Sequence, residues 1–316
     1  AVEACLEAGM RASIGIIVIE TETAWARDVT DYVDRGVELL EAHRSDPLIQ
    51  FTFSPHAPYT VSDETLRRIA HLSEQLQVSV HTHLLETEWE IKQSYQQHDR
   101  HPLGRLEQMG LLNSRLQAVH MTQLSADDIE KVASSGVQVI HCPQSNLKLA
   151  SGFCPLTTLQ EAGVNVALGT DGAASNNDLD MLAEAQTAAL LAKGVAGNAQ
   201  AVDAFAAIEM MTLNGASALG LEGEIGTIEP GKQADLCALD LSGPETQPLH
   251  HVASQLVYAA STRQVSDVWV AGRRVLEGGQ LTTINIDDVL RQAQQWQLKL
   301  ARQPDKWDAN RQEFAR

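Results

Sequence analysis

The sequence predicts an α/β fold, a (β/α)8 barrel of the TIM type followed by a small β-sheet or sandwich module. Two observations favour this fold. Six short apolar runs alternate with helical patterns from Arg11 to Lys193, as parallel strands joined by crossover helices do. No glycine-rich phosphate fingerprint follows the first run, which disfavours a doubly wound nucleotide-binding sheet. Because only six units are found, we expect the first two of the eight to lie outside this chain.

The predicted strands are short and mostly apolar, as expected where both faces of a strand are buried. The clearest is the run SIGIIVIE, which is apolar at nearly every position. In chain order the strand-like runs are Ser13–Glu20, Leu48–Ser54, Val78–His83, Leu116–His120, Val137–Cys142 and Val164–Gly169.

Each run leads into a predicted helix. Ser125, with Asp128 three residues on, is a helix start, and Gly136 is a helix stop. A loop at Pro143–Gly152 precedes the fifth helix. In chain order the helices are Asp28–His43, one from Ser62, one after Glu86, Ser125–Gly136, Pro155–Gly163 and Leu179–Lys193.

Beyond a helix at Ala201–Leu213 the pattern changes. Gly223–Asp240 and Val265–Gly279 are short β runs interrupted by turn residues, so we expect them to pair in one sheet that contributes no catalytic residue. Asp287–Lys299 predicts a final helix. The predicted division is an N-terminally incomplete barrel at 1–222, a β module at 223–283 and a C-terminal helix at 284–316.

The composition narrows the class of protein and its partners. The 316 residues are 44% hydrophobic and 20% charged, and no apolar run is long enough to cross a bilayer, so we expect a cytoplasmic protein. The four cysteines form no CxxC pair, which disfavours a disulfide framework and a thiolate zinc site. A formal net charge of −18 disfavours nucleic acids and membranes as partners. A small neutral or cationic substrate is favoured, and a homo-oligomer is left open.

The run VSVHTHLLE, from Val78 to Glu86, combines a predicted strand with a histidine and a carboxylate that are three residues apart, His83 and Glu86. In an extended strand His81 and His83 point to the same face, and Glu86 follows just past the strand end, so His83 and Glu86 can converge. A neutral imidazole suits zinc or iron, and a carboxylate that does not bind the metal can carry protons between water and a leaving group. The run therefore predicts a metal-assisted hydrolytic site.

The same pattern recurs at other strand ends. His56, His120, His141 and Asp171 all fall at or just beyond the carboxyl end of a predicted strand. In (β/α)8 barrels the chemistry takes place at this end. A single histidine there would be an ordinary polar residue at a strand exit, but the recurrence favours one shared site.

Six motifs resemble one known family. They are Ser54–Tyr59 (SPHAPY), His83–Thr87 (HLLET), Ala118–His120 (AVH), His141–Gly152 (HCPQSNLKLASG), Gly169–Asn177 (GTDGAASNN) and Gly226–Asp235 (GTIEPGKQAD). On these motifs essentially the whole chain resembles the amidohydrolase superfamily, in its branch of metal-dependent nucleoside deaminases and triazine hydrolases. Within this branch it resembles the bacterial 5-methylthioadenosine/S-adenosylhomocysteine deaminases. The resemblance implies hydrolytic deamination of the adenine ring of these two nucleosides, which releases the inosyl product and ammonia.

The resemblance also implies a role for each motif residue. One divalent metal ion, zinc with iron(II) as the alternative, is held by His83 and Asp171. Asp171 also takes a proton from the attacking water, and Glu86 relays it to the ring nitrogen and then to the ammonia. His120 hydrogen-bonds the attacking hydroxide or the oxyanion that develops.

The implied substrate-binding residues are His56, Glu86, Asp171 and Ser175. We interpret His81 and His141 as structural, and Asn146 and Lys148 as residues that shape their loop.

The family takes two further metal ligands from a His-x-His pair on the first barrel strand, which we expect upstream of Ala1. The chain begins without an initiator methionine, inside what reads as the end of a helix that closes at Gly9. We therefore expect the chain to be the remainder of a longer one.

Two alternatives stay open at this point. One is another aminopurine or pyrimidine deaminase, or an s-triazine hydrolase, of the same superfamily, because all of these use similar residues. The other is non-enzymatic: a metal-poor, truncated remnant, which the missing His-x-His pair would explain.

Overall fold

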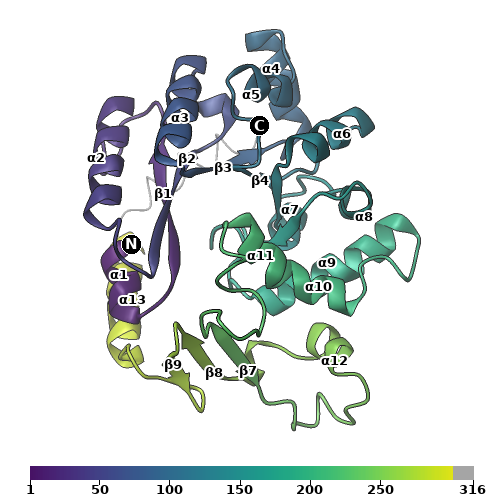
Figure 1. Cartoon of the computed structure of the whole chain (residues 1–316). Helices are drawn as coiled ribbons and strands as arrows, with labels where there is room; N and C mark the ends of the chain where they lie inside the picture. The colour runs from purple at the N-terminus through teal and green to yellow at the C-terminus, as the bar shows by residue number, and fades with distance from the viewer. Residues whose placement is uncertain (302–316) are drawn as a thin grey trace.

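The structure of the chain is a computed structural model that describes residues 1–301. Six strands form one parallel sheet in the order β1-β2-β3-β4-β5-β6 (Figure 1). They are β1 (Ala12–Val18), β2 (Ile49–Pro55), β3 (Ser79–Leu84), β4 (Leu116–His120), β5 (Gln138–His141) and β6 (Val166–Leu168). The spatial order equals the chain order, so the sheet has no point at which the winding reverses. A doubly wound sheet would have one, and the predicted parallel α/β fold is confirmed.

Helices join successive strands, and Figure 1 shows α2, α3 and α6 along the outside of the sheet. The helices of this part are α1 (Val2–Ala8), α2 (Val29–Ala42), α3 (Asp63–Leu76), α4 (Glu88–His98), α5 (Pro102–Gln108), α6 (Ala126–Ser135), α7 (Pro143–Lys148), α8 (Leu156–Glu161), α9 (Met181–Ala196), α10 (Ala204–Met211) and α11 (Leu213–Ala218), with one short 3-10 helix at Pro58–Thr60. None of the helices among residues 1–301 has both the length and the apolar character needed to cross a membrane.

Local signals explain where the helices begin and end. The Ser125 hydroxyl accepts from the Asp128 backbone N–H while the Asp128 carboxylate accepts from the Ser125 backbone N–H, a capping box at the start of α6. Gly136 ends α6 with φ 70°, a left-handed conformation that glycine adopts at low cost. Two predictions were wrong. The predicted loop at 143–152 opens with α7, because Pro143 stands at the first helical position, where its missing N–H costs nothing. The segment after Glu86 holds two helices rather than one.

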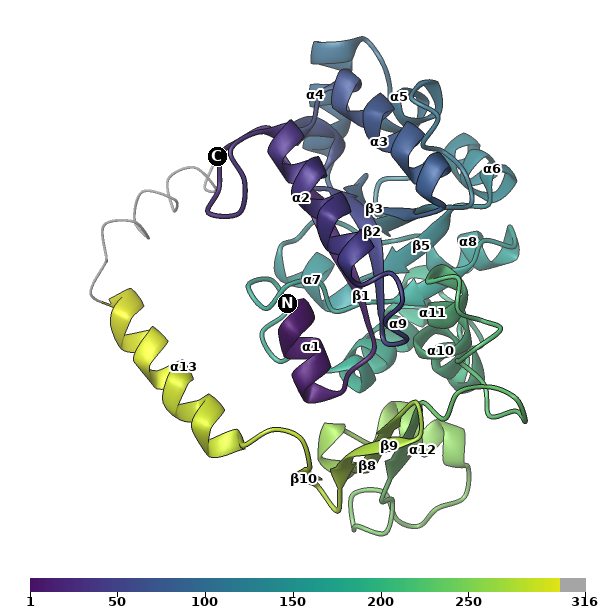
Figure 2. The same cartoon turned by 60° about the vertical axis from the view of Figure 1, so that its left-hand side comes forward.

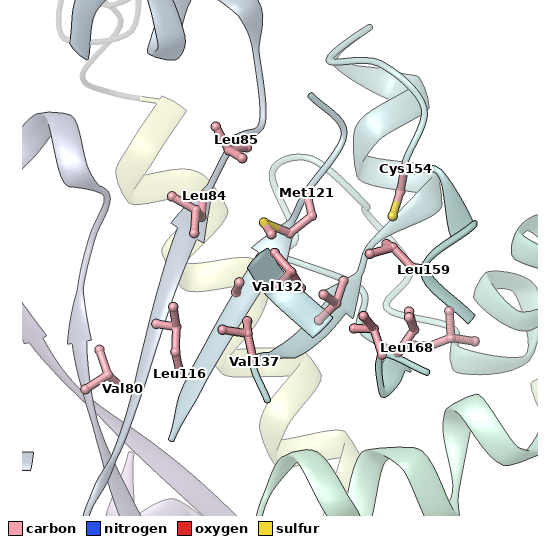
Figure 3. Close-up of a cluster of buried hydrophobic side chains, with 14 of the residues drawn as sticks. Val80, Leu84, Leu85, Leu116, Met121, Val132, Val137, Cys154, Leu159 and Leu168 are labelled. Atoms are coloured by element: carbon pink, nitrogen blue, oxygen red, sulfur yellow. The ribbon is translucent and has the colours of Figure 1, made fainter. Parts of the chain in front are cut away.

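The core fills the space between the sheet and its helices. Phe53 on β2 and Leu116 on β4 are completely buried, as are Leu66 and Ile69 on α3. Figure 3 shows Val80, Leu84 and Leu116 on neighbouring strands, with Val137 and Leu159 packed further along the same cluster. Burial of such side chains stabilises the fold by roughly 1.5–3 kcal/mol each. The core therefore holds the strands in place and so determines where their carboxyl ends lie.

Gly36 allows α2 to pack closely against β1. A Cβ atom built on Gly36 would lie 2.1 Å from Cγ2 of Ile16. We predict that Gly36→Ala lowers the free energy of unfolding by about 1–3 kcal/mol, because the overlap forces side chains or backbone to shift. Urea unfolding of the purified protein measures this.

Gly194→Ala in α9 is the matched control, because no atom lies within 4 Å of the added Cβ. This variant should gain roughly 0.5–1 kcal/mol, since alanine loses less conformational entropy than glycine in a helix. If both variants moved stability in the same direction, the close packing of α2 on β1 would be wrong.

The last part of the described chain forms a second, antiparallel sheet in the order β10-β9-β8-β7. Its strands are β7 (Leu236–Leu239), β8 (Val265–Val270), β9 (Arg273–Glu277) and β10 (Gln280–Leu281), and it is accompanied by α12 (Val252–Tyr258) and a 3-10 helix at Thr262–Gln264. β7 and β8 pair directly, so the two predicted β runs do meet in one sheet. Figure 1 shows this sheet separate from the parallel one.

The two sheets are tied together by an ion pair. The Nε of Arg11, just before β1, lies 2.6 Å from Oδ2 of Asp235, and the other Asp235 oxygen accepts from the Ala271 backbone N–H at 2.7 Å. Asp235 thus joins the two sheets, and the expectation that the module contributes no catalytic residue stays a prediction. Helix α13 (Ile286–Ala301) follows and stands apart from the parallel sheet in Figure 2. The predicted C-terminal unit 284–316 extends past it to positions outside the described residues, and the predicted domain boundaries stay predictions.

Candidate metal and proton-transfer site

Four side chains meet at the carboxyl edge of the parallel sheet. His83 is near the end of β3, His120 ends β4, and Glu86 and Asp171 follow β3 and β6. The Nε2 atom of His83 lies 3.9 Å from Oδ1 of Asp171, and the Nε2 atom of His120 lies 3.6 Å from Oε2 of Glu86. The rings of His83 and His120 are 5.3 Å apart between centroids. The structure therefore brings together the two predicted metal ligands, His83 and Asp171, with the predicted proton relay Glu86 and with His120.

The backbone bends sharply where these strands end. His120 and Asp171 have φ values of 78° and 61°, and Leu85 and Met121 have 51° and 52°. Residues other than glycine rarely adopt a positive φ, and those that do are concentrated at functional sites. Leu85 and Met121 are fully buried beside the ends of β3 and β4 (Figure 3). Their burial holds the unusual backbone in place and directs Glu86 and His120 toward the site.

Asp171 is held through one of its two oxygens. The hydroxyls of Ser145 and Ser175 both donate to Oδ2, at 2.7 and 2.6 Å. Burial by itself would raise the pKa of Asp171, but the hydrogen bonds from the two serines and from the Gly172 backbone outweigh it, and the pKa is lowered. Asp171 is therefore a carboxylate at neutral pH, and its Oδ1 faces His83.

His83 is a neutral imidazole at neutral pH. The pKa of His83 is lowered to about 4, first by burial and then by the neighbouring His120 and His56, whose positive charges would repel a protonated His83. A metal ion binds the neutral form of histidine. His83 is therefore in the protonation state that a metal ligand needs.

Glu86 lies between two polar partners. Its Oε1 accepts from the Ser151 hydroxyl at 2.9 Å, while its Oε2 faces His120. Its backbone N–H donates to the carboxylate of Glu90 at 3.0 Å. Glu90 is buried, and burial raises its pKa to about 7. These contacts fix both the backbone and the side chain of Glu86.

His120 makes a hydrogen bond between its Nδ1 and Oδ1 of Asn146, at 2.8 Å. Because an amide oxygen only accepts, the Nδ1 of His120 is the donor of this hydrogen bond, and Nε2 faces the site. Asn146, expected only to shape its loop, thus orients His120. His120 is 1% exposed, so this orientation is enforced by packing on all sides.

The remaining predicted residues lie around this centre. The ring of His56 is 5.2 Å from that of His83, and its Nδ1 pairs with the Thr60 hydroxyl at 3.2 Å. The Ser175 hydroxyl is engaged by Asp171, and its predicted contact with substrate stays a prediction. His81 contacts the side-chain oxygen of Gln117 at 3.0 Å instead of the cluster.

His141 is fully buried, and burial lowers its pKa to about 3. The unfolded chain takes up a proton near pH 6.5, whereas the folded chain stays neutral down to about pH 3. The contribution of His141 to stability is therefore complete above pH 6.5 and declines as the pH falls toward 3.

We predict that the free energy of unfolding of His141→Met falls less steeply than that of the parent protein as the pH is lowered from 7 to 5. The two slopes should differ by up to about 1.4 kcal/mol per pH unit. Unfolding in urea at several pH values, without added metal, measures the two slopes. His71→Met, at an exposed position of α3, should keep the parent slope. Equal slopes for all three proteins would show that His141 takes up its proton in the folded state.

Ligand atoms of His83, His120 and Asp171 all lie within 4.8 Å of one another. Two imidazoles and an ionised carboxylate form a donor set that suits a divalent transition metal. Glu86, a carboxylate beside this set, is in position for proton transfer. The class that this fold and this site define is a metal-dependent hydrolase with its site at the carboxyl edge of a parallel sheet.

The chain belongs to the amidohydrolase family, whose model matches residues 1–275. It is 52% identical over 294 residues to a 5-methylthioadenosine/S-adenosylhomocysteine deaminase of Teredinibacter turnerae. The matched region covers 93% of this chain and 66% of that protein. A protein of Saccharophagus degradans with the same name is 45% identical, over 95% of this chain and 67% of its own length. The chain thus spans about two thirds of the length of these relatives.

Solved structures agree with the fold. An adenosine deaminase of Xanthomonas campestris with bound zinc superposes with a TM-score of 0.93 at 50% identity, over 95% of this chain and 68% of that one. An atrazine chlorohydrolase of Arthrobacter aurescens, complexed with zinc, superposes with a TM-score of 0.84 at 22% identity, over 92% of this chain and 67% of that one. At that identity the second match speaks for the fold alone.

Sequence reasoning missed the residues that hold the site in place. Ser145, Ser151, Glu90 and Glu184 each contact a site residue or its loop, yet none was singled out. Ser145 and Ser151 lie inside a recognised motif, which was a usable signal. The two glutamates lie in helices, where an acidic residue is usually exposed.

Proposed function

We propose that the full-length protein hydrolyses the exocyclic C–N bond of the adenine ring in 5'-methylthioadenosine and S-adenosylhomocysteine. The products are the inosyl compounds and ammonia. The observation that carries this proposal is the approach of His83 to Asp171 and of Glu86 to His120, in a chain 52% identical to a deaminase of that name. A small-molecule nucleoside is accordingly the proposed partner.

We also propose that the six parallel units belong to a (β/α)8 barrel. The unreversed strand order favours a closed barrel over an open doubly wound sheet. Within residues 1–301, β1 and β6 each pair with a single neighbour in this sheet, so two further strands could join these edges. The high TM-score against a chain of which this one covers 68% supports the same view.

His83 and Asp171 are the residues we assign to one divalent metal ion, zinc with iron(II) as the alternative. The lowered pKa values of both side chains supply the required neutral imidazole and ionised carboxylate. When bound, such an ion lowers the pKa of a coordinated water from about 15.7 to about 7 and so supplies hydroxide at neutral pH. His120 lies close enough to be a third ligand, but we assign it the hydrogen bond to the attacking hydroxide or to the oxyanion that develops.

Glu86 is assigned the proton transfers. Water adds to the ring carbon that carries the amino group, and the adjacent ring nitrogen must then accept a proton as its double bond opens. Both protons come from the attacking water. Asp171 takes up the first, and Glu86 relays it to the ring nitrogen. The second leaves the added hydroxyl as the carbonyl forms, and Glu86 delivers it to the departing amino group. The carbon retains the oxygen as a carbonyl. His56, beside His83, is placed to hydrogen-bond the ring or the ribose.

We prefer the enzyme to the metal-poor remnant because the acid–base groups are assembled and held by partners. A remnant would have no need for an oriented His120 or for Asp171 fixed through one oxygen. The triazine hydrolases match at only about a fifth identity, which supports the shared fold and no shared substrate.

The test is a panel of compounds followed by ultraviolet absorbance, since adenine and hypoxanthine rings absorb differently. With zinc or iron(II) added back to chelated protein, we expect both thioether nucleosides to be converted and free adenine, cytosine and chlorinated triazines to react less well. The same preparation carrying Glu86→Gln controls for contaminating deaminase. Dominant activity on a free base or a triazine, with none on the thioether nucleosides, would overturn the substrate assignment.

A further inference from the structure

Glu184 is a completely buried glutamate in the first turn of α9 that takes no part in the chemistry above. Both of its oxygens accept hydrogen bonds. Oε2 accepts from the backbone N–H of Gln144, at 3.1 Å, and Oε1 accepts from the side-chain amide of Asn176. A buried carboxylate is costly unless it is satisfied in this way. Glu184 therefore joins the start of α7 to the loop that follows β6.

Each of these partners is next in sequence to a residue that holds Asp171. Gln144 precedes Ser145, and Asn176 follows Ser175. Ser145 and Ser175 both donate to Oδ2 of Asp171. The Glu184 carboxylate on α9 thus binds the two chain segments that carry Ser145 and Ser175, and these two serines bind the Asp171 carboxylate.

The two serine hydrogen bonds determine which Asp171 oxygen is available. They occupy Oδ2, while Oδ1 lies 3.9 Å from Nε2 of His83. If the serines moved apart, Asp171 could rotate and present either oxygen in more than one direction. Fixing a ligand in the orientation that the ion needs is what partners behind a metal site do.

We propose that Glu184 is a positioning residue that holds Asp171 in its metal-binding orientation through Ser145 and Ser175. The metal-binding role of Asp171 is part of the proposed function, so this inference rests on it. Glu184 supports the binding of the zinc or iron(II) ion indirectly, and it contacts neither the ion nor the substrate itself.

Glu184→Gln is the sharpest variant, because it keeps the shape of the side chain and replaces one acceptor by a donor. The new amide group then faces either the Gln144 N–H or the Asn176 amide, and one of the two hydrogen bonds is lost. We expect zinc affinity to fall by about 10–100-fold, measured by competition with a chromogenic chelator. Hydrogen exchange of the backbone amides at 171–177 should also become faster in the metal-free protein.

A second substitution should restore the lost contact. In Glu184→Gln combined with Asn176→Asp, the glutamine amide can donate to the new carboxylate while its oxygen still accepts from the Gln144 N–H. Zinc affinity should return to within a few-fold of the parent protein. Glu161→Gln, at an exposed position in α8, is the matched control and should change nothing.

Coupling separates positioning from a general effect on the fold. Ser145→Ala and Ser175→Ala should each weaken zinc binding, and Glu184→Gln should add little to the double serine variant, because it acts through the same two hydrogen bonds. Parent zinc affinity in Glu184→Gln, or losses that simply multiply when the variants are combined, would overturn the proposal.

The zinc and hydrogen-exchange measurements need no substrate. They decide the role of Glu184 even if the protein fails to deaminate thioether nucleosides, and so keep the two proposals separate. In the active enzyme we further expect Glu184→Gln to lower kcat because it loses metal. Its KM, measured at saturating zinc, should change less than kcat, because Glu184 does not contact the substrate.

Discussion

Glu86→Gln, made in the full-length protein, is expected to lower kcat by about 10²–10⁴-fold while the metal content stays at the parent level. The amide keeps the size of the side chain and can still accept from Ser151, whose hydroxyl lies 2.9 Å from Oε1. It cannot take up a proton and pass it on. The loss should therefore appear in kcat, with little change in KM. Steady-state ultraviolet assays and metal analysis of the same sample measure both quantities.

Glu88→Gln is the matched control for this prediction. Glu88 lies two residues further on, at an exposed position in the first turn of α4, where it pairs with Lys92 at 2.8 Å. The same chemical change there should leave kcat within about two-fold, since exposed ion pairs contribute little. Near-normal turnover of Glu86→Gln would reduce Glu86 to a structural residue that anchors the end of β3.

His83→Ala is expected to lose both the metal and the activity. His83 supplies the neutral imidazole that faces Oδ1 of Asp171. A site deprived of one ligand binds a divalent ion far more weakly. Metal analysis after dialysis should find much less than the parent amount of zinc or iron, and turnover should fall to the level of the chelated enzyme.

His71→Ala, on the exposed face of α3, removes a histidine of the same kind without touching the site. It should retain the full metal content and rate. A His83→Ala protein that kept its metal through dialysis would show that the ion is held elsewhere, and the assignment of His83 as a ligand would have to be withdrawn. Circular dichroism of both variants checks that the fold persists.

The sequence by itself determined the order of the elements and the edge at which the site lies. The apolar run SIGIIVIE and the alternating run VSVHTHLLE placed β1 and β3 to within two residues or so. Parallel strands in chain order bring their carboxyl ends to one edge, which is why His83, His120 and Asp171 could be expected to meet. The motif resemblance then supplied a chemical role for each residue.

Only the tertiary structure decided which side chains hold the site residues in place. Ser151 lies 65 positions from Glu86, and Asn146 lies 26 positions from His120. Such pairs leave no periodic pattern in a sequence, because their contact depends on the path of two loops that meet only after the strands have paired.

The same limit explains why the role of Glu184 escaped prediction. A glutamate in the first turn of a helix is usually exposed, and its negative charge interacts favourably with the positive end of the helix dipole. Whether it is buried depends on what packs over it, and here Gln144 and Asn176 come from two separate segments. Local propensities act over a few residues, so they set the strands and most helices. The orientation of the Asp171 carboxylate is set by hydrogen bonds between distant segments, and these exist only in the folded chain.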